Sequence, residues 1–315
     1  MITAEVTGVR KMKIAVIGPG AMGMLYGGKL SAAADAVLVG NNAARISEIR
    51  EYGVAIHREG TELVYHPDAV LNGEEKEPAD LVILFTKAYL TEGALTDNRA
   101  LIGADTFVLS LQNGMGHERI LRKFADENHV LIGTTAQGSS RINGHTISHT
   151  GLGETVIGAL RESDNRAQIE EIRQVFEKAG FPCSISDTIR YAVWNKLMIN
   201  ASSSVLSGVL QKRQGYVAEN EYAWGICCDL IREICDTACR DGWLFDYEEQ
   251  KERIYRHLKQ APDGWPSICE DLKTGRRTEA DFISGAVIRT AQEQGRQVPV
   301  QEMIVRLVHA MESFR

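Results

Sequence analysis

The glycine-rich hexapeptide at residues 18–23 constrains the fold of this chain more than any other feature of its sequence. Its six residues are Gly18, Pro19, Gly20, Ala21, Met22 and Gly23. In this spacing the first glycine permits a tight turn, the second lets backbone approach a pyrophosphate, and the third lets a helix pack closely on a strand. The start of that helix would offer unpaired N–H groups to the phosphates. The alternative is a glycine-rich turn that binds nothing, but its place between an apolar run and a helical stretch favours a dinucleotide site.

The first half of the chain alternates short apolar runs with helical stretches, a pattern typical of buried parallel strands. The expected strands lie at residues 13–18, 36–40, 79–86, 106–113, 130–135 and 154–159. Two hairpins interrupt the alternation, one around Gly60 and the other around Asn143-Gly144, a strong tight-turn dipeptide. A helix at residues 165–179, closed by Gly180, ends this half.

After Pro182 the pattern changes to helical periodicity almost throughout. The expected helices lie at residues 188–210, 216–241, 246–260, 277–295 and 300–313. A length of 315 residues suits two domains. The sequence therefore predicts an α/β Rossmann-type N-terminal domain at residues 1–184 and an all-α C-terminal domain at residues 185–315.

Composition excludes several classes of function. The chain is 44% hydrophobic and 24% charged, with a formal net charge of −7, so it lacks the basic footprint of a nucleic-acid-binding protein. No stretch approaches the roughly 18 apolar residues of a membrane-spanning helix. The N-terminus does not resemble a secretory signal. Without such a signal, we expect a cytoplasmic protein. We also expect its cysteines to be reduced and to form no metal site.

The end of the second expected strand bears on the choice of cofactor. An acid at this place holds the ribose of NAD, but the chain has Asn41 and Asn42 here. The missing carboxylate favours NADPH, although NADH is not excluded. The nearest cation, Arg45, falls inside the next expected helix.

Polar residues follow three later strands of the expected sheet. They are Lys87, Asn113 and the pair Thr134-Thr135. Ligands of open α/β sheets bind at the carboxyl ends of the strands, so we expect these residues to line one crevice. For Lys87 alone, the alternative is a solvated surface side chain.

A polar stripe crosses the apolar helix that opens the second half. Lys196, Asn200 and Ser204 recur at four-residue spacing and so share one face. A desolvated lysine has a lowered pKa and can act as an acid or base near neutral pH, whereas the alternative is a solvated helix face. Glu279 falls near the start of the expected helix 277–295, where it could instead be a first-turn acid that interacts with the helix dipole.

Together these motifs resemble the ketopantoate reductases, or 2-dehydropantoate 2-reductases, over nearly the whole chain. The residues that carry the resemblance are Gly18–Gly23, Thr86-Lys87-Ala88, Gln112-Asn113-Gly114-Met115-Gly116, Gly133-Thr134-Thr135, Trp194-Asn195-Lys196-Leu197, Asn200, Pro266-Ser267 and Thr278-Glu279. The resemblance implies a Rossmann domain followed by a helical, 6-phosphogluconate-dehydrogenase-like domain. It also implies a role in pantothenate biosynthesis, on the route to coenzyme A.

The resemblance implies a role for each matching residue. Lys196 matches the general acid, and Glu279 matches an acid close to both that lysine and the nicotinamide ribose. Lys87 and Asn113 match contacts to the cofactor and to the reacting end of the substrate. The positions that match substrate-binding residues are Asn200, Ser204 and Ser267.

Three departures fall on the substrate and phosphate sides. Ser204 replaces a frequent Asn, and Asn42 stands where known members carry an Arg for the 2′-phosphate. The segment 263–265 replaces an Asn that precedes the substrate-binding Ser.

The resulting prediction is NAD(P)H-dependent reduction of a small 2-oxo acid, first of all ketopantoate to pantoate. Two alternatives stay open. One is a related reductase or dehydrogenase for another oxo or hydroxy acid, and the other is a non-catalytic dinucleotide sensor. A homodimer through the apolar helices is a further open prediction.

Overall fold

The computed structural model describes residues 10–161 and 165–312 and divides the chain into two compact units. The first unit comprises Met1–Gln112 and Glu118–Ile189, and the second comprises Asn113–His117 and Arg190–Arg315. The short segment Asn113–His117 thus leaves the first unit and packs with the second. The predicted domain boundary between residues 184 and 185 stays a prediction.

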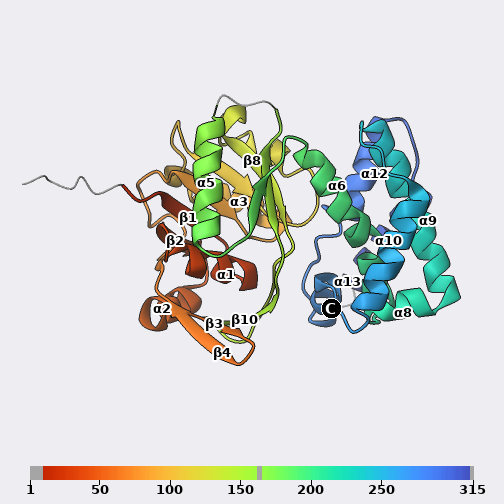
Figure 1. Ribbon diagram of the computed structural model, residues 1–315, viewed down its shortest axis with the longest axis horizontal. Helices are drawn as coiled ribbons and strands as arrows, with labels where there is room; N and C mark the ends of the chain where they lie inside the picture. The colour runs from red at the N-terminus through yellow and green to blue at the C-terminus, as the bar shows by residue number, and fades with distance from the viewer. Residues whose placement is uncertain (1–9, 162–164, 313–315) are drawn as a thin grey trace, which may run out of the picture. The chain divides into compact units, whose positions relative to one another are not determined.

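The described part of the first unit is built on an eight-stranded sheet with strand order β12-β11-β8-β7-β6-β1-β2-β5. Figure 1 shows this sheet with β1, β2 and β8 labelled. Its strands are β1 (Lys13–Ile17), β2 (Asp35–Gly40), β5 (Asp68–Leu71), β6 (Leu81–Leu84), β7 (Phe107–Ser110), β8 (Val130–Thr135), β11 (Thr155–Ala159) and β12 (Cys183–Ile185). Neighbouring strands are parallel except β8 and β11. The strand order reverses beside β1, which lies between β2 and β6, and ligands of doubly wound sheets bind at such a point.

Helices cover both faces of this sheet because alternate residues of each strand point to opposite sides. Ile14 and Val16 of β1 join the apolar cluster that contains side chains of α1, α2 and α5, whereas Ala15 and Ile17 join the cluster on the other face, with α3 and α4. The helices of this unit are α1 (Ala21–Leu30), α2 (Ala43–Tyr52), α3 (Thr91–Asp97), α4 (Glu118–Leu121) and α5 (Arg166–Lys178), with short 3-10 turns at Ala88–Leu90, Arg99–Leu101 and Glu127–His129.

The two predicted hairpins pair with each other in a second, four-stranded sheet with order β4-β3-β10-β9. Its strands are β3 (Val54–Arg58), β4 (Thr61–Tyr65), β9 (Gly138–Arg141) and β10 (Thr146–Gly151). Both hairpins are confirmed as antiparallel pairs. The parallel pairing of β3 with β10 joins segments far apart in the sequence, and the sequence alone did not predict it.

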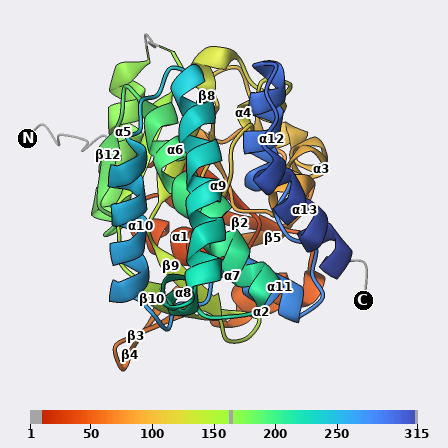
Figure 2. The ribbon, with the colours of Figure 1, turned by 90° about the vertical axis from the view of Figure 1, so that its right-hand side faces the viewer.

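The second unit is helical in its described residues. Its helices are α6 (Ile189–Ile199), a π-helical turn (Asn200–Ser204), α7 (Val205–Leu210), α8 (Gln214–Glu219), α9 (Glu221–Arg240), α10 (Tyr247–Gln260), α11 (Ser267–Lys273), α12 (Ser284–Glu293) and α13 (Pro299–Glu312). Helix α9 packs against α10, α12 and α13 (Figure 2). No helix in the described ranges is long and apolar enough to cross a membrane.

Three predicted helices differ from the structure. The expected helix 188–210 is interrupted by the π-helical turn at Asn200–Ser204. The expected helix 216–241 is divided at Asn220, whose side chain accepts a hydrogen bond from the backbone N–H of Ala223 and so starts α9. The expected helix 277–295 begins only at Ser284. Residues 277–282 form a turn instead, because backbone groups of Thr278 and Phe282 bond to distant parts of the unit. Glu279 is therefore not a first-turn acid of a helix.

Candidate functional site

The glycine loop has the tight geometry that its spacing predicts. Gly18 has a φ of +98°, and a Cβ at this residue would lie 2.6 Å from the backbone nitrogen of Thr86. A Cβ at Gly23 would lie 2.0 Å from the carbonyl oxygen of Gly18. A Cβ at Gly20, in contrast, would meet no heavy atom within 4 Å. The first and third glycines are thus required by the fold, and the space beside Gly20 is available to a ligand.

The start of α1 fits a phosphate group. Gly20 is the N-cap of this ten-residue helix and has no side chain that could cap it. The first N–H groups of a helix have no partner within the helix and attract anions. A dinucleotide therefore fits the residues present here.

A buried amide holds the ends of β6 and β7 beside the glycine loop. The Gln112 Nε2 atom donates to the backbone oxygen of Thr86 at 2.8 Å, and the hydroxyl of Ser110 donates to Gln112 Oε1 at 3.0 Å. Gln112 is 7% exposed. Because it fixes Thr86, it also fixes the start of the segment that carries Lys87. The partial exposure of Lys87 fits a residue just beyond the carboxyl end of the central strand β6.

After the end of β2, Asn42 and Arg45 make different contacts. Asn42 is the N-cap of α2, and its side-chain oxygen accepts a hydrogen bond from the backbone N–H of Arg45 at 2.9 Å. The guanidinium of Arg45 reaches back to the glycine loop and donates to the carbonyl of Pro19 at 3.2 Å. Burial lowers the pKa of Arg45, and the charge of Arg141 lowers it further. A cation beside the loop is therefore provided by α2, three residues after Asn42.

Thr135, which the sequence placed at a strand end that would line a crevice, is buried and bonded to Tyr26. It is 6% exposed, and its hydroxyl accepts a hydrogen bond from Tyr26 at 2.7 Å. The Tyr26 hydroxyl also lies 2.6 Å from that of Thr155. Burial raises the pKa of Tyr26 to about 12, so this cluster is a neutral contact between α1, β8 and β11.

Lys196 and Glu279 interact electrostatically within the second unit. Lys196 lies in the last turn of α6, and burial lowers its pKa to about 8. The carboxylate of Glu279 opposes this shift and raises the pKa. Glu279 is only 8% exposed. A lysine with this pKa exists in both protonation states near neutral pH, as a general acid requires.

A π-helical turn interrupts the polar stripe between Lys196 and Ser204. The hydroxyls of Ser202 and Ser203 donate to the backbone oxygens of Met198 and Ile199. Such bonds compete with the α-helical ladder and bend helices, and π-turns often occur at functional sites. Asn200 is the first residue of this turn and is partly buried.

Gln214 links the substrate-side residues that the sequence singled out. Its Nε2 atom donates to the hydroxyl of Ser204 at 3.2 Å, and its backbone N–H donates to the carbonyl of Gly264 at 3.0 Å. Gly264 lies three residues before Ser267, the exposed first residue of α11. The sequence reasoning missed Gln214, because its two partners lie 10 and 50 positions away along the chain.

Asn113 belongs to a segment that contacts the Glu279 turn. The backbone N–H of Met115 donates to the carbonyl of Phe282 at 2.9 Å, and the ring of His117 stacks on Phe282 with centroids 5.3 Å apart. The carbonyl of Asn113 lies 2.9 Å from His117 Nε2. The structure thus places the candidate residues Asn113 and Glu279 on neighbouring segments of one unit.

These features define a class of protein: a Rossmann-type dinucleotide-binding unit followed by a helical unit, as in dinucleotide-dependent oxidoreductases. The profile of the ketopantoate reductase PanE/ApbA family matches residues 14–162, and the profile of its C-terminal domain matches residues 188–312. A 2-dehydropantoate 2-reductase of Pyrococcus horikoshii is 31% identical over 304 residues, which cover 96% of this chain and 98% of that protein. The chain belongs to the ketopantoate reductase family.

Solved structures support the same fold. A ternary structure of D-mandelate dehydrogenase with NADH and anilino(oxo)acetate matches with a TM-score of 0.90 at 28% identity, covering 96% of this chain and 99% of that one. A PanE/ApbA family ketopantoate reductase from Ralstonia eutropha matches with a TM-score of 0.86 at 26% identity, with the same coverage. The predicted family and fold class are confirmed.

Proposed function

We propose that this protein reduces 2-dehydropantoate to (R)-pantoate with NADPH. The observation that carries the proposal is the interaction of the partly buried Lys196 with Glu279, in a family member that also keeps the open glycine loop. The proposed activity belongs to pantothenate biosynthesis, and a cytoplasmic location is part of the proposal. The domain limits 1–184 and 185–315 and a homodimer stay predictions.

The chain's own residues supply binding, orientation and a proton. The bound reduced nicotinamide supplies the hydride that reaches the carbonyl carbon of the substrate. The glycine loop, residues 18–23, holds the pyrophosphate, with Lys87, Asn113 and Glu279 as further cofactor contacts. Lys196 Nζ donates its proton to the carbonyl oxygen as that oxygen gains negative charge, and the neutral amine then takes a proton from solvent.

The substrate-binding residues have neutral or positive side chains that suit a hydroxylated oxo acid. They are Asn113, Lys196, Asn200, Ser204 and Ser267. Lys196 pairs with the developing alkoxide, and the amides and hydroxyls bond to the carboxylate and hydroxyl ends. The hydrogen bond from Gln214 to Ser204 supports this role, because it orients the Ser204 hydroxyl.

The pH dependence of the reaction follows from the state of Lys196. The lysine must be protonated to act as the acid, and its pKa is about 8, so kcat/KM is expected to fall as the pH rises above about 8. Glu279→Gln removes the charge that raises this pKa, so the fall should begin at lower pH. Glu252→Gln, on the exposed face of α10, is the control and should leave the profile unchanged. Identical profiles for wild type and Glu279→Gln would contradict the pairing.

Arg45 supports a preference for NADPH over NADH. Its guanidinium lies beside the glycine loop at the end of β2, where doubly wound folds read the ribose, and Arg141 adds a second positive charge. A hydrogen bond to a charged group contributes about 1.5–3 kcal/mol, which is roughly tenfold or more in affinity. Arg45→Ala is therefore expected to weaken NADPH binding by about that factor and to leave NADH binding nearly unchanged.

Titration of each cofactor by fluorescence measures this preference. Arg50→Ala is the matched control, because Arg50 lies on the same helix but bonds to Ala69 and Glu74. Equal losses for NADPH and NADH would contradict the role of Arg45. Asn42→Arg adds a cation but removes the cap of α2, so its cofactor preference must be read beside its stability.

A related activity on an aromatic 2-oxo acid is the second candidate. The likeness to D-mandelate dehydrogenase in complex with NADH favours it. Initial rates with 2-dehydropantoate, phenylglyoxylate and other 2-oxo acids, each with NADPH and NADH, separate the candidates. The highest kcat/KM for 2-dehydropantoate supports the proposal, whereas cofactor binding without turnover of any oxo acid would identify a non-catalytic sensor.

A further inference from the structure

The segment that carries Glu279 is an irregular turn at residues 277–282, between α11 and α12. Within it, the carbonyl of Glu279 accepts hydrogen bonds from the backbone N–H groups of Phe282 and Ile283 at 2.9 and 3.0 Å. The segment is not itself part of a regular helix or strand. The position of the Glu279 carboxylate therefore depends on what holds the turn.

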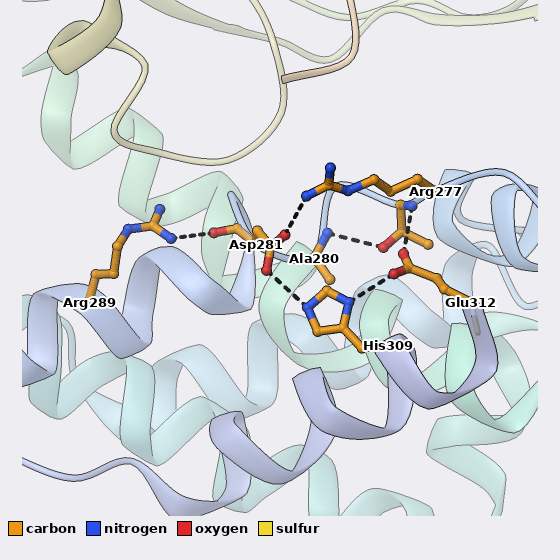
Figure 3. A network of polar contacts seen from close by, with 7 residues as sticks. Arg277, Ala280, Asp281, Arg289, His309 and Glu312 are labelled. Atoms are coloured by element: carbon orange, nitrogen blue, oxygen red, sulfur yellow. Dashed lines mark hydrogen bonds and ion pairs between the residues drawn. The ribbon is translucent and has the colours of Figure 1, made fainter. Parts of the chain in front are cut away.

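The last turns of α13 hold this segment at residues before and after Glu279. Figure 3 shows His309 of α13 between Asp281 and Glu312. His309 Nε2 lies 3.0 Å from Asp281 Oδ1, and His309 Nδ1 lies 2.8 Å from Glu312 Oε2. The other carboxylate oxygen of Glu312 accepts a hydrogen bond from the backbone N–H of Thr278 at 2.7 Å. Thr278 precedes Glu279 and Asp281 follows it, so one imidazole–carboxylate pair on α13 fastens the turn at two points.

Both ring nitrogens of His309 face carboxylate oxygens, so both act as donors when the ring is an imidazolium. The hydrogen bond to Glu312 is the largest of the effects that raise the pKa of His309, and Asp281 raises it further. Two arginines also contact Asp281: Arg277 pairs with its carboxylate at 3.1 Å, and Arg289 donates to its carbonyl at 2.7 Å. Opposite charges thus alternate around Asp281.

The same turn also supports the segment that carries Asn113. Phe282 accepts the hydrogen bond from the Met115 N–H and stacks on His117. A Cβ at Gly114 would lie 2.2 Å from the carbonyl oxygen of Phe282, and Gly114 has a φ of +96°, so the approach of the two segments depends on this glycine. A displacement of the turn would move two candidate site residues together.

We propose that His309 is a positioning residue for the reaction. Its imidazolium, bridging Asp281 and Glu312, holds the 277–282 turn so that Glu279 keeps its electrostatic contact with Lys196. This inference rests on the proposed function for its effect on turnover. Its effect on Lys196 itself does not depend on turnover and can be measured without substrate.

His309→Ala is expected to lower kcat by roughly 10- to 100-fold, because a misplacement of about 1 Å can cost that much. The fall of kcat/KM at high pH should begin at lower pH than in wild type, in the same direction as in Glu279→Gln. In a Glu279→Gln background, the added His309→Ala should not shift the pH at which kcat/KM falls any further, because the two changes act through one interaction. His309→Arg, which keeps a cation with several donors, should restore most of the wild-type profile.

Competitive acetylation of Lys196 at a series of pH values, read by mass spectrometry on the full chain, gives the pKa of the lysine without any turnover. We expect a lower pKa in His309→Ala and Glu279→Gln than in wild type. Arg306→Ala is the matched control, since Arg306 lies on the same helix and pairs with Glu302. If His309→Ala does not fold, Asp281→Asn breaks the same contact with little change in volume.

A wild-type pKa for Lys196 in folded His309→Ala, or in Asp281→Asn, would overturn the inference. A loss of thermal stability with an unchanged pH profile would also overturn it, since that is the result of a purely structural contact. If the lysine pKa falls as expected but wild type reduces no oxo acid, the positioning role stands and the proposed function fails.

Discussion

Replacing Lys196 by alanine is expected to lower kcat by about 10²–10⁴-fold, the usual contribution of a positioned general acid. Cofactor binding should be retained, because Lys196 is not among the proposed cofactor contacts and the glycine loop belongs to the other unit. Stopped-flow or steady-state rates of NADPH oxidation with 2-dehydropantoate, together with a fluorescence titration of NADPH, measure both quantities.

Lys259→Ala is a suitable control for this experiment. Lys259 is an exposed lysine on α10 of the same unit, so its loss changes the net charge equally without touching the proposed acid. Turnover of Lys196→Ala within a few fold of the control would show that another group donates the proton. Loss of NADPH binding in Lys196→Ala would show that the lysine serves the cofactor and not the carbonyl oxygen.

Gly23→Ala is expected to lower the stability of the fold, whereas Gly20→Ala is expected to lower the affinity for NADPH. A Cβ at Gly23 would lie 2.0 Å from the Gly18 carbonyl oxygen, and overpacking of this kind costs about 1–3 kcal/mol of unfolding free energy. A Cβ at Gly20 meets no protein atom within 4 Å, and its φ of −77° suits alanine. The unfolding free energy of Gly20→Ala should therefore lie within about 1 kcal/mol of wild type. Its binding of NADPH should be weaker by about tenfold or more.

Urea unfolding and NADPH titration of the two variants separate these effects, and each variant is the other's control. Normal NADPH affinity in Gly20→Ala would contradict the placement of the pyrophosphate beside this residue. Full stability in Gly23→Ala would mean that the start of α1 can move away from Gly18, contrary to the close packing described above.

The sequence predicted the features whose causes are local. The first strand, the glycine loop and both hairpins depend on residues within a few positions of one another, and all of them are confirmed. The interruption of the polar stripe by a π-turn was not predicted, because it depends on hydroxyl bonds from Ser202 and Ser203 that compete with a helical pattern. The predicted start of the helix at residues 277–295 was wrong for another reason. Thr278 is held by a residue 34 positions away, which no periodicity reveals.

Residues that hold others in place were the hardest to find from the sequence. His309 and Asp281 are 28 positions apart, and Gln112 bonds to Thr86 over 26 positions. The sequence indicated Arg45 as the nearest cation but did not predict that its guanidinium reaches back to the carbonyl of Pro19. The candidate acid and the cofactor loop carry a sequence pattern, but the side chains that orient them are recognised only when the fold brings them together.

The destination of the hydride tests the central claim most directly. The enzyme is incubated with 2-dehydropantoate and NADPH carrying deuterium at both C4 positions of the nicotinamide, and the product is analysed by mass spectrometry and NMR. The account predicts pantoate with one deuterium at carbon 2 for each NADPH oxidised. Absence of pantoate, or pantoate without deuterium at carbon 2, would contradict it.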